Sequence, residues 1–352
     1  MNSHPQVYKT GNTWERKVYA HMSAYLEKKG VTEFGATSAG NQYKHWLKEA
    51  DGRLNFVSDE IYNATIERFA SHKAGDLSRV KTNTAASQPY CFNLFVYLQQ
   101  HPALASALFS RLLAKQVTIE HIEVEFTPNR LGNLAGFEQT NADESIGDQG
   151  ANQGTDSDVA IFYTYANNRK GVLLIEFKFI EPEFSVCSSY KNKPALKTVC
   201  NTGGYYSRIV DGKETDKNNR VLCGYNKYQN WVLTSSSTLF DANKISNSIG
   251  CPFRYGANQL WRNLLLAEKV AAARNCDEFA FWVFSPKAND DFLWKEGAED
   301  VEQKLRSILS PSGNDSFKKV HLEDVLGILE DLCINEEDKL WLAKMKEKYL
   351  IA

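Results

Sequence analysis

The stretch Gly171-Val-Leu-Leu-Ile-Glu-Phe-Lys-Phe-Ile180 places one acid and one base inside an otherwise apolar run. Such a run, rich in β-branched and aromatic residues, is typical of a buried β-strand. Because alternate residues of a strand share a face, Glu176 and Lys178 are predicted to project together and Phe177 the other way. Burying both charges costs desolvation free energy, which suggests that something at this face uses them. The alternative is an ion pair on an exposed strand, worth about 0–1 kcal/mol.

A second β-rich run, Asp158-Val-Ala-Ile-Phe-Tyr-Thr-Tyr165, precedes the first. The connecting Ala166-Asn-Asn-Arg-Lys170 is turn-forming sequence, so the two runs are predicted to form an antiparallel hairpin. With the turn centred near Asn168, Asp158 is expected opposite Lys178, one pair away from Glu176. Two carboxylates can hold Mg²⁺, which activates a bound water, and a neighbouring lysine can orient that water or stabilise charge on a phosphate.

The flanking sequence predicts the rest of a mixed α/β unit. Residues 117–126 alternate apolar and polar side chains, which is typical of a strand with one wet face. Residues 127–156 are rich in Gly, Asn, Gln and Asp and are expected to form a long loop. Residues 258–273 are expected to form a helix and residues 278–285 a buried strand. The predicted order is therefore strand, strand, strand, helix, strand.

Three regions divide the 352 residues, a length that corresponds to about two domains or one elaborated domain. Residues 1–115 are predicted to be helical and to pack on the core, with Asn12 and Glu15 spaced as a capping box. Residues 116–290 are predicted to form the α/β core, with an irregular insertion at 184–250. Residues 291–352 are predicted to be a helical appendage.

Composition excludes several classes of protein. The net charge of −2 gives no overall excess to attract nucleic acid or a membrane surface, and no apolar run approaches the roughly 18 residues of a bilayer span. Seven scattered cysteines without a Cys-x-x-Cys pair favour reduced thiols in a cytoplasmic protein. Four of them bracket the insertion, and the missing pair motif disfavours a zinc or iron–sulfur site there; these are Cys187, Cys200, Cys223 and Cys251.

Asp158 followed by Glu176-Phe177-Lys178, in this strand order, resembles the PD-(D/E)XK nuclease superfamily. The stretches Gly154-Thr-Asp-Ser-Asp-Val159 and Ile175-Glu-Phe-Lys-Phe-Ile-Glu181 are similar to a bacterial restriction-endonuclease-like group, in which a segment like Ser87-Gln-Pro-Tyr-Cys-Phe-Asn-Leu-Phe95 is expected upstream. The resemblance implies a mixed four- or five-stranded sheet flanked by helices. It also implies a divalent-metal-dependent DNA nuclease. Ser157 stands where a proline is usual, and Asp156 is an alternative to Asp158.

The resemblance assigns roles to the residues of the motif. Asp158 and Glu176 are expected to bind the metal with the carbonyl of Phe177, and Lys178 to act on the attacking water. Mg²⁺ is the expected cofactor, with Mn²⁺ as a substitute. Glu125 is the candidate for a third carboxylate, although a solvated strand face is a slightly preferred interpretation of Glu123 and Glu125.

Candidate DNA contacts come from the insertion and from the helix after it. Residues 185–230 carry eight Lys and Arg against three Asp and Glu, and five tyrosines are interleaved with them. Cations for phosphates and rings for bases suit nucleic-acid binding, and an ordinary polar loop is an equally favoured alternative. The candidates are Lys191, Lys193, Lys197 and Arg208, with Arg262 as a phosphate contact and Gln259 beside the active site.

The function expected from these features is an endonuclease in restriction or phage defence. The alternatives are a catalytically inactive, nuclease-fold module that binds nucleic acid, and a repair-type exonuclease. DNA is the expected partner and no membrane is expected. A homodimer and partner proteins of a defence system are left open, because the sequence does not decide between them and a single chain acting alone.

Overall fold

A five-stranded mixed sheet forms the centre of the computed structural model, which describes residues 7–71, 76–127, 156–192, 194–202, 223, 238–297 and 299–351. Its strands are β1 (Val117–Phe126), β2 (Ser157–Tyr165), β3 (Arg169–Phe177), β4 (Glu278–Ser285) and β7 (Phe317–His321), in that spatial order. β1, β2 and β3 are antiparallel, and β4 and β7 run parallel to β3. A separate pair consists of β5 (Lys295–Glu296) and β6 (Glu299–Asp300). The predicted mixed α/β sheet is confirmed.

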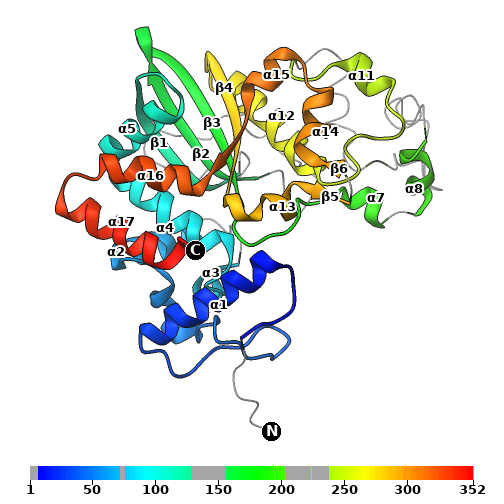
Figure 1. Cartoon of the computed structure of the whole chain (residues 1–352). Helices are drawn as coiled ribbons and strands as arrows, with labels where there is room; N and C mark the ends of the chain where they lie inside the picture. Colours follow the sequence, from blue (N-terminus) through cyan, green and yellow to red (C-terminus); the bar gives the residue numbers. More distant parts are fainter. Residues whose placement is uncertain are drawn as a thin grey trace.

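Helices cover both faces of this sheet (Figure 1). Before the sheet come α1 (Thr13–Lys28), α2 (Asp59–Ser71), α3 (Leu77–Thr82), α4 (Ser87–Gln100) and α5 (Pro102–Leu112). Between β3 and β4 lie α7 (Ser188–Asn192), α8 (Pro194–Cys200), α11 (Ala242–Ser246) and α12 (Ala257–Ala273). After β4 come α13 (Asp290–Leu293), α14 (Val301–Ile308), α15 (Pro311–Ser316), α16 (Leu322–Leu332) and α17 (Glu336–Tyr349). The described residues contain no helix whose length and apolar character would let it cross a bilayer.

The alternation of β3 decides on which face of the sheet each side chain lies. Ile175 and Phe177 belong to a hydrophobic cluster that also contains residues of α4, α5, α16 and α17. Val172 and Leu174 belong to a second cluster, built with α12 and α14. Because side chains alternate along a strand, Glu176 faces the second layer, toward α12.

The β2–β3 hairpin turns on two asparagines. Asn167 and Asn168 have φ angles of 62° and 57°, which asparagine tolerates better than most residues with a Cβ. Val159 is paired with Ile175, so the ladder brings Asp158 level with Glu176. The expected pairing of Asp158 with Lys178 is wrong, because a turn centred one residue earlier moves the register by two residues.

β1 does not keep the strict period of two that its sequence predicts. The register with β2 shifts between Ile119 and His121, which introduces one extra residue. Glu123 is consequently buried rather than solvated, with 1% of its surface exposed. Glu125 has a φ angle of 54°, and Phe126 beyond it lies in the α12 layer whereas Val124 lies in the opposite one.

The last part of the chain, predicted to be helical, also contains the strands β5, β6 and β7. Residues 317–321 form β7, which pairs with β4, where the sequence indicates helix. This strand is too short and too polar to be recognised by its pattern, since Lys318 and Lys319 occupy its centre. The capping box at Asn12 and Glu15 is confirmed. Most of the long loop predicted at 127–156 lies outside the described residues.

Candidate active site

The structure brings Asp158, Glu176 and Lys178 together at the ends of β2 and β3. Asp158 Oδ2 accepts a 2.6 Å hydrogen bond from the Phe177 N–H, which ties the two strand ends. Lys178 Nζ lies 2.9 Å from Glu176 Oε1, and only 11% and 5% of these two side chains is exposed. An exposed ion pair, the alternative interpretation of this motif, is therefore wrong.

Two amides of α12 fix the Glu176 carboxylate. Gln259 Nε2 donates to Glu176 Oε1 at 2.6 Å, and Asn263 Nδ2 donates to Glu176 Oε2 at 2.8 Å. Residues four apart on a helix are neighbours on one face, so α12 presents both donors to the same carboxylate. The Ser185 N–H donates to Gln259 Oε1 at 3.0 Å, which holds the amide in this orientation. Both carboxylate oxygens of Glu176 are thus satisfied without any loss of negative charge.

The other carboxylates of the site are protonated more easily than usual. Burial raises the pKa of Asp158 well above its ordinary value, and the charges of Glu176 and Glu125 add to this effect. Burial also raises the pKa of Glu125 to about 7, helped by Asp156 and Glu176 and opposed by the hydrogen bond from Gln88. Three carboxylates that repel one another in a buried site would be stabilised by a cation.

Lys178 has the opposite electrostatic environment. Burial alone would lower its pKa, but the charges of Glu176, Glu181 and Asp158 outweigh burial, so the net shift is upward. These charges favour the ammonium form of Lys178, which donates hydrogen bonds and stabilises negative charge.

The start of α4 reaches the site from the opposite layer. Gln88 Nε2 donates to Glu125 Oε1 at 2.7 Å, and Ser87 Oγ donates to Glu181 Oε1 at 2.5 Å. These contacts place the upstream segment 87–95 next to the carboxylates. Glu123 has a different role, because it pairs with Arg68 at 2.8 Å and with His121 at 3.0 Å. The solvated strand face that the sequence favoured for Glu123 is wrong.

The carboxylates of the site do not converge on one point, although carboxylate oxygens are ligands that hard divalent cations prefer. In the part of the chain that the structure describes, no three His, Cys, Asp or Glu side chains are arranged to hold one metal ion. Magnesium proteins commonly supply only one or two carboxylates and leave the other positions to water. Asp158 and Glu176 meet that need, with Glu125 electrostatically coupled to both. Asp156 is exposed and accepts a hydrogen bond from Thr127 Oγ1 at 2.8 Å.

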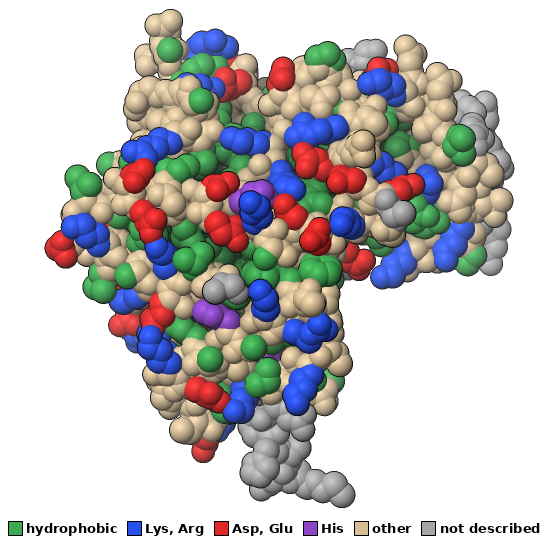
Figure 2. Space-filling view, in the orientation of Figure 1, with side chains coloured by type: hydrophobic (Ala, Val, Ile, Leu, Met, Phe, Trp, Pro, Cys, Tyr) green, Lys and Arg blue, Asp and Glu red, His purple; other side chains and the backbone are tan. Residues whose placement is uncertain are grey.

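The candidate DNA contacts fall into three groups. Lys191 on α7 and Lys197 on α8 are exposed, and lysine and arginine side chains lie along that edge of the molecule (Figure 2). Lys193 and Arg208 lie outside the described residues. On α12, Arg262 Nε donates to Asn258 Oδ1 at 3.1 Å, and Gln259 is held by Glu176. Gln259 thus lies beside Glu176.

Sequence reasoning missed three residues of the site. Asn263 and Gln88 donate to Glu176 and Glu125, and Glu181 accepts from Ser87 and from the Phe179 N–H. A signal for Asn263 was present, because it is a polar residue four positions after Gln259 on an apolar helix face. Gln88 and Glu181 lie in two of the segments that carry the family resemblance, but the sequence assigned them no role, because the contacts Gln88–Glu125 and Ser87–Glu181 join segments far apart in the chain.

Comparison with known proteins matches the chain to a family model. A family model described as the PD-(D/E)XK nuclease superfamily matches residues 9–351, nearly the whole chain. No curated protein matches the chain, and no solved structure does.

Proposed function

Because the chain belongs to the PD-(D/E)XK nuclease superfamily, we propose that it hydrolyses the phosphodiester bonds of DNA with a divalent metal ion. The observation that carries this proposal is the buried Glu176–Lys178 pair beside Asp158. Burying an ion pair is a poor way to stabilise a fold, so its presence at two strand ends favours a catalytic use. The mixed sheet flanked by helices agrees with the restriction-endonuclease-like fold of the superfamily.

The metal site that we propose consists of Asp158, Glu176 and the carbonyl of Phe177, with Glu125 as a further carboxylate. A bound Mg²⁺, or Mn²⁺ in its place, would polarise the scissile phosphate and lower the pKa of a water. Gln259 and Asn263 orient Glu176 but leave its charge intact, so the carboxylate remains available to a cation. Asp156 is the alternative to Asp158.

The raised pKa of Lys178 supports one of the roles that the sequence leaves open for it, that of a cationic group. Since its pKa is raised by the surrounding carboxylates, it keeps its proton at neutral pH. We therefore propose that Lys178 orients the attacking water and stabilises the negative charge that develops on the phosphate, and that it does not remove the proton of that water.

The biological setting that we propose is an endonuclease of restriction or phage defence, and it rests on the family resemblance. Lys191 and Lys197 are the described candidates for contacts with the DNA backbone, together with Arg262. Lys193 and Arg208 remain predictions from the sequence. A homodimer and defence-system partner proteins are part of this proposed setting.

Cleavage assays on different DNA topologies test the proposed activity. The purified protein is incubated with closed circular plasmid, linear duplex and single-stranded DNA, each in EDTA, Mg²⁺ and Mn²⁺. We expect the circle to be nicked or linearised with either metal and to stay intact in EDTA. An exonuclease would degrade linear DNA and spare the circle. Binding without cleavage in any metal would indicate an inactive module instead.

A double variant tests the assigned residues. Glu176→Gln with Lys178→Met should lower the cleavage rate by about 10³-fold or more, because it removes a metal ligand and the charge that stabilises the phosphate. The matched control is Glu302→Gln with Lys304→Met, the same change at a Glu-x-Lys sequence that begins α14. Circular dichroism should show that both proteins are folded. Cleavage by the first variant at the wild-type rate would refute the assignment.

A further inference from the structure

Ser285, the last residue of β4, has a buried hydroxyl group that the proposed mechanism does not use. None of its surface is exposed, and among the described residues its Oγ has no hydrogen-bond partner. Buried hydroxyl groups in folded proteins are nearly always paired, because an unpaired one has lost its hydrogen bonds to water without replacement. The hydroxyl of Ser285 therefore points to a partner that binds it in another state of the protein.

The central sheet places Ser285 beside Lys178. The Lys178 N–H donates to the Phe284 carbonyl at 2.8 Å, which extends the parallel ladder of β3 and β4 by one residue. Val283 lies in the α12 layer and Phe284 in the opposite one. The alternation of β4 therefore turns Ser285 toward α12, as the alternation of β3 turns Glu176 and Lys178. Ser285 and Lys178 are thus neighbours on adjacent strands and on the same face of the sheet.

The neighbour of Ser285 on its other side is His321 of β7, and this residue is occupied by carboxylates. Its Nε2 lies 2.9 Å from Asp290 Oδ2, and its Nδ1 faces Asp324 Oδ2 at 3.8 Å. With both ring nitrogens directed at acids, His321 is a poor partner for the hydroxyl. Lys178 is the better donor for it.

The ammonium group of Lys178 has the donors for a second acceptor. It carries three N–H bonds at the end of a flexible stem. Its Nζ lies 2.9 Å from Glu176 Oε1, and the same oxygen accepts from Gln259 Nε2 at 2.6 Å. The contact with Glu176 uses one of the three N–H bonds, so the ammonium can serve another oxygen on the same face.

We propose that Ser285 is a positioning residue for Lys178, and that its hydroxyl oxygen is the second acceptor of the ammonium group. With this acceptor, Lys178 can leave Glu176 and still be held beside the reacting phosphate. A serine oxygen accepts a hydrogen bond but carries no charge, so it orients the ammonium without neutralising it. Lys178 then keeps the charge that the proposed reaction needs. This inference rests on the proposed nuclease function and deepens the role of Lys178 in it.

Urea unfolding of four proteins tests the contact without any cleavage. These are the wild type, Ser285→Ala, Lys178→Met and the double variant. Ser285→Ala should lower the urea midpoint by about 0.3–0.6 M, because a buried ammonium loses an acceptor. With Lys178→Met present, the same change should leave the midpoint unchanged or raise it, since it then removes a hydroxyl that has no donor to bind. Equal effects of Ser285→Ala in the two backgrounds would overturn the proposal.

The matched control is Ser157→Ala in the same two backgrounds. Ser157 is also buried, but its Oγ donates to the carbonyls of Val159 and Ile175 at 3.1 and 2.9 Å. Its loss should lower the midpoint equally with Lys178 or methionine at position 178. If Lys178→Met does not fold, the single variant Ser285→Ala decides. A lowered midpoint supports the contact, and a raised one shows that the hydroxyl has no partner and overturns it.

Cleavage kinetics test the use of this contact. Ser285→Ala should lower kcat by about 10-fold and leave KM for DNA unchanged, because Lys178 is misplaced while the DNA contacts are intact. With Lys178→Met present, it should slow cleavage no further, since residues that act as a unit are not additive. An unchanged kcat for Ser285→Ala would overturn the positioning role. If the wild-type protein cuts no DNA with Mg²⁺ or Mn²⁺, the proposed function fails, and the unfolding measurements still decide whether Ser285 serves Lys178.

Discussion

At the scale of single residues, the groups that orient the Glu176 carboxylate differ from the groups that determine the electrostatic field around it. The neutral amides of Gln259 and Asn263 orient Glu176. Lys178 and the neighbouring carboxylates determine the electrostatic field around it. An amide donor satisfies a buried oxygen without neutralising it, so the carboxylate keeps its attraction for a cation. In the proposed mechanism, Asn263 would act through Glu176 as a positioning residue.

Removing this amide should change the metal requirement of the reaction. Asn263→Ala leaves one buried oxygen of Glu176 without its donor, which costs about 1–3 kcal/mol and frees the carboxylate to rotate. We expect cleavage to slow by about 10- to 100-fold and the Mg²⁺ concentration for half-maximal rate to rise, as for other residues that orient metal ligands. Rates measured across a Mg²⁺ titration check this.

The control for this variant is another buried asparagine. Asn93 donates to carbonyl oxygens of Asn55 and Pro89 and to Tyr349, in the layer opposite α12. Asn93→Ala should lower the free energy of unfolding and leave the Mg²⁺ requirement unchanged. If Asn263→Ala behaved like Asn93→Ala, Asn263 would be a structural residue only.

A buried histidine predicts how the fold responds to acid. His45 is 2% exposed and packs against Tyr19 and Tyr43, and burial lowers its pKa to about 3. In the unfolded chain its pKa is near 6.5, so between pH 6.5 and 3 the unfolded state binds the extra proton. Stability contributed by neutral His45 is complete above pH 6.5 and is lost as the pH falls through this window, by up to about 1.4 kcal/mol per pH unit.

Urea unfolding at pH 7 and pH 4.5 measures this contribution. The wild-type protein should lose about 2–3 kcal/mol more than His45→Phe over this interval. Tyr43→Phe changes the same aromatic group without removing the titrating residue, so it should keep the wild-type pH dependence. Equal slopes for wild type and His45→Phe would show that His45 is protonated in the folded state.

At the scale of secondary-structure elements, the sequence predicted which segments form strands better than it predicted how the residues of neighbouring strands pair. The predicted runs at 158–165 and 171–180 form strands, the second only as far as Phe177, and the alternation of faces along β3 is confirmed by the two hydrophobic clusters on either side of it. The register was wrong because it depends on which turn residues adopt positive φ. Turn propensity does not decide where among adjacent asparagines the turn is centred. The bulge in β1 could not be predicted either, because no residue pattern in segment 117–126 indicates it.

The hairpin turn itself can be tested. Asn168 has a φ of 57°, and a β-branched side chain in this conformation costs roughly 1–2 kcal/mol. Asn168→Val should lower the free energy of unfolding by about that amount, whereas Asn168→Gly should leave it unchanged or raise it. Ala166→Val changes an exposed residue of the same turn that does not have positive φ, and it should have a much smaller effect. Urea midpoints compare the three variants.

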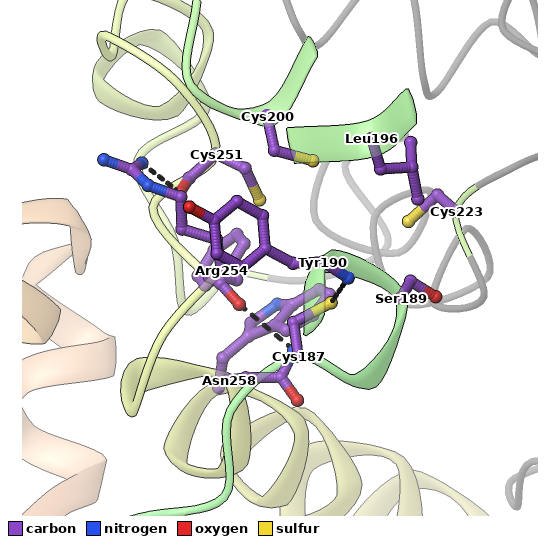
Figure 3. A pocket seen from close by; sticks show the side chains of 11 residues that line it. Cys187, Ser189, Tyr190, Leu196, Cys200, Cys223, Cys251, Arg254 and Asn258 are labelled. Carbon is purple, nitrogen blue, oxygen red and sulfur yellow. Dashed lines mark hydrogen bonds between the residues drawn. The ribbon is translucent and has the colours of Figure 1, made fainter. Parts of the chain in front are cut away.

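At the scale of the whole molecule, the candidate site depends on tertiary contacts that no local sequence pattern predicts. Segment 87–95, β1 and the β2–β3 hairpin could each be predicted, but not that Gln88 would meet Glu125. The cavity lined by Cys187, Cys200, Cys223 and Cys251 (Figure 3) shows the same limit, since neighbouring members of this set lie 13 to 28 residues apart in the sequence with no motif. The proximity of Asp158, Glu176 and Lys178 could be predicted from the sequence because all three residues lie on one hairpin.

The C-terminal region can be tested at this scale by truncation. An appendage could be removed without unfolding the core, whereas a region that contributes a strand to the central sheet could not. β7 completes the sheet beside β4, and β7, α16 and α17 bury large side chains in the same cluster as β1 to β4. These include Val320, Leu322, Val325, Leu326, Leu329, Trp341, Leu342, Met345 and Tyr349.

At roughly 1.5–3 kcal/mol for each buried side chain, their removal costs more than about 10 kcal/mol, which is comparable to the whole stability of a typical domain. A chain ending at residue 290 should therefore show no cooperative unfolding transition and no cleavage. Circular dichroism during urea titration, beside the full chain, checks this. A truncated protein that unfolds cooperatively and still cuts DNA would establish residues 291–352 as an appendage, and would mean that β4 can close the sheet without β7.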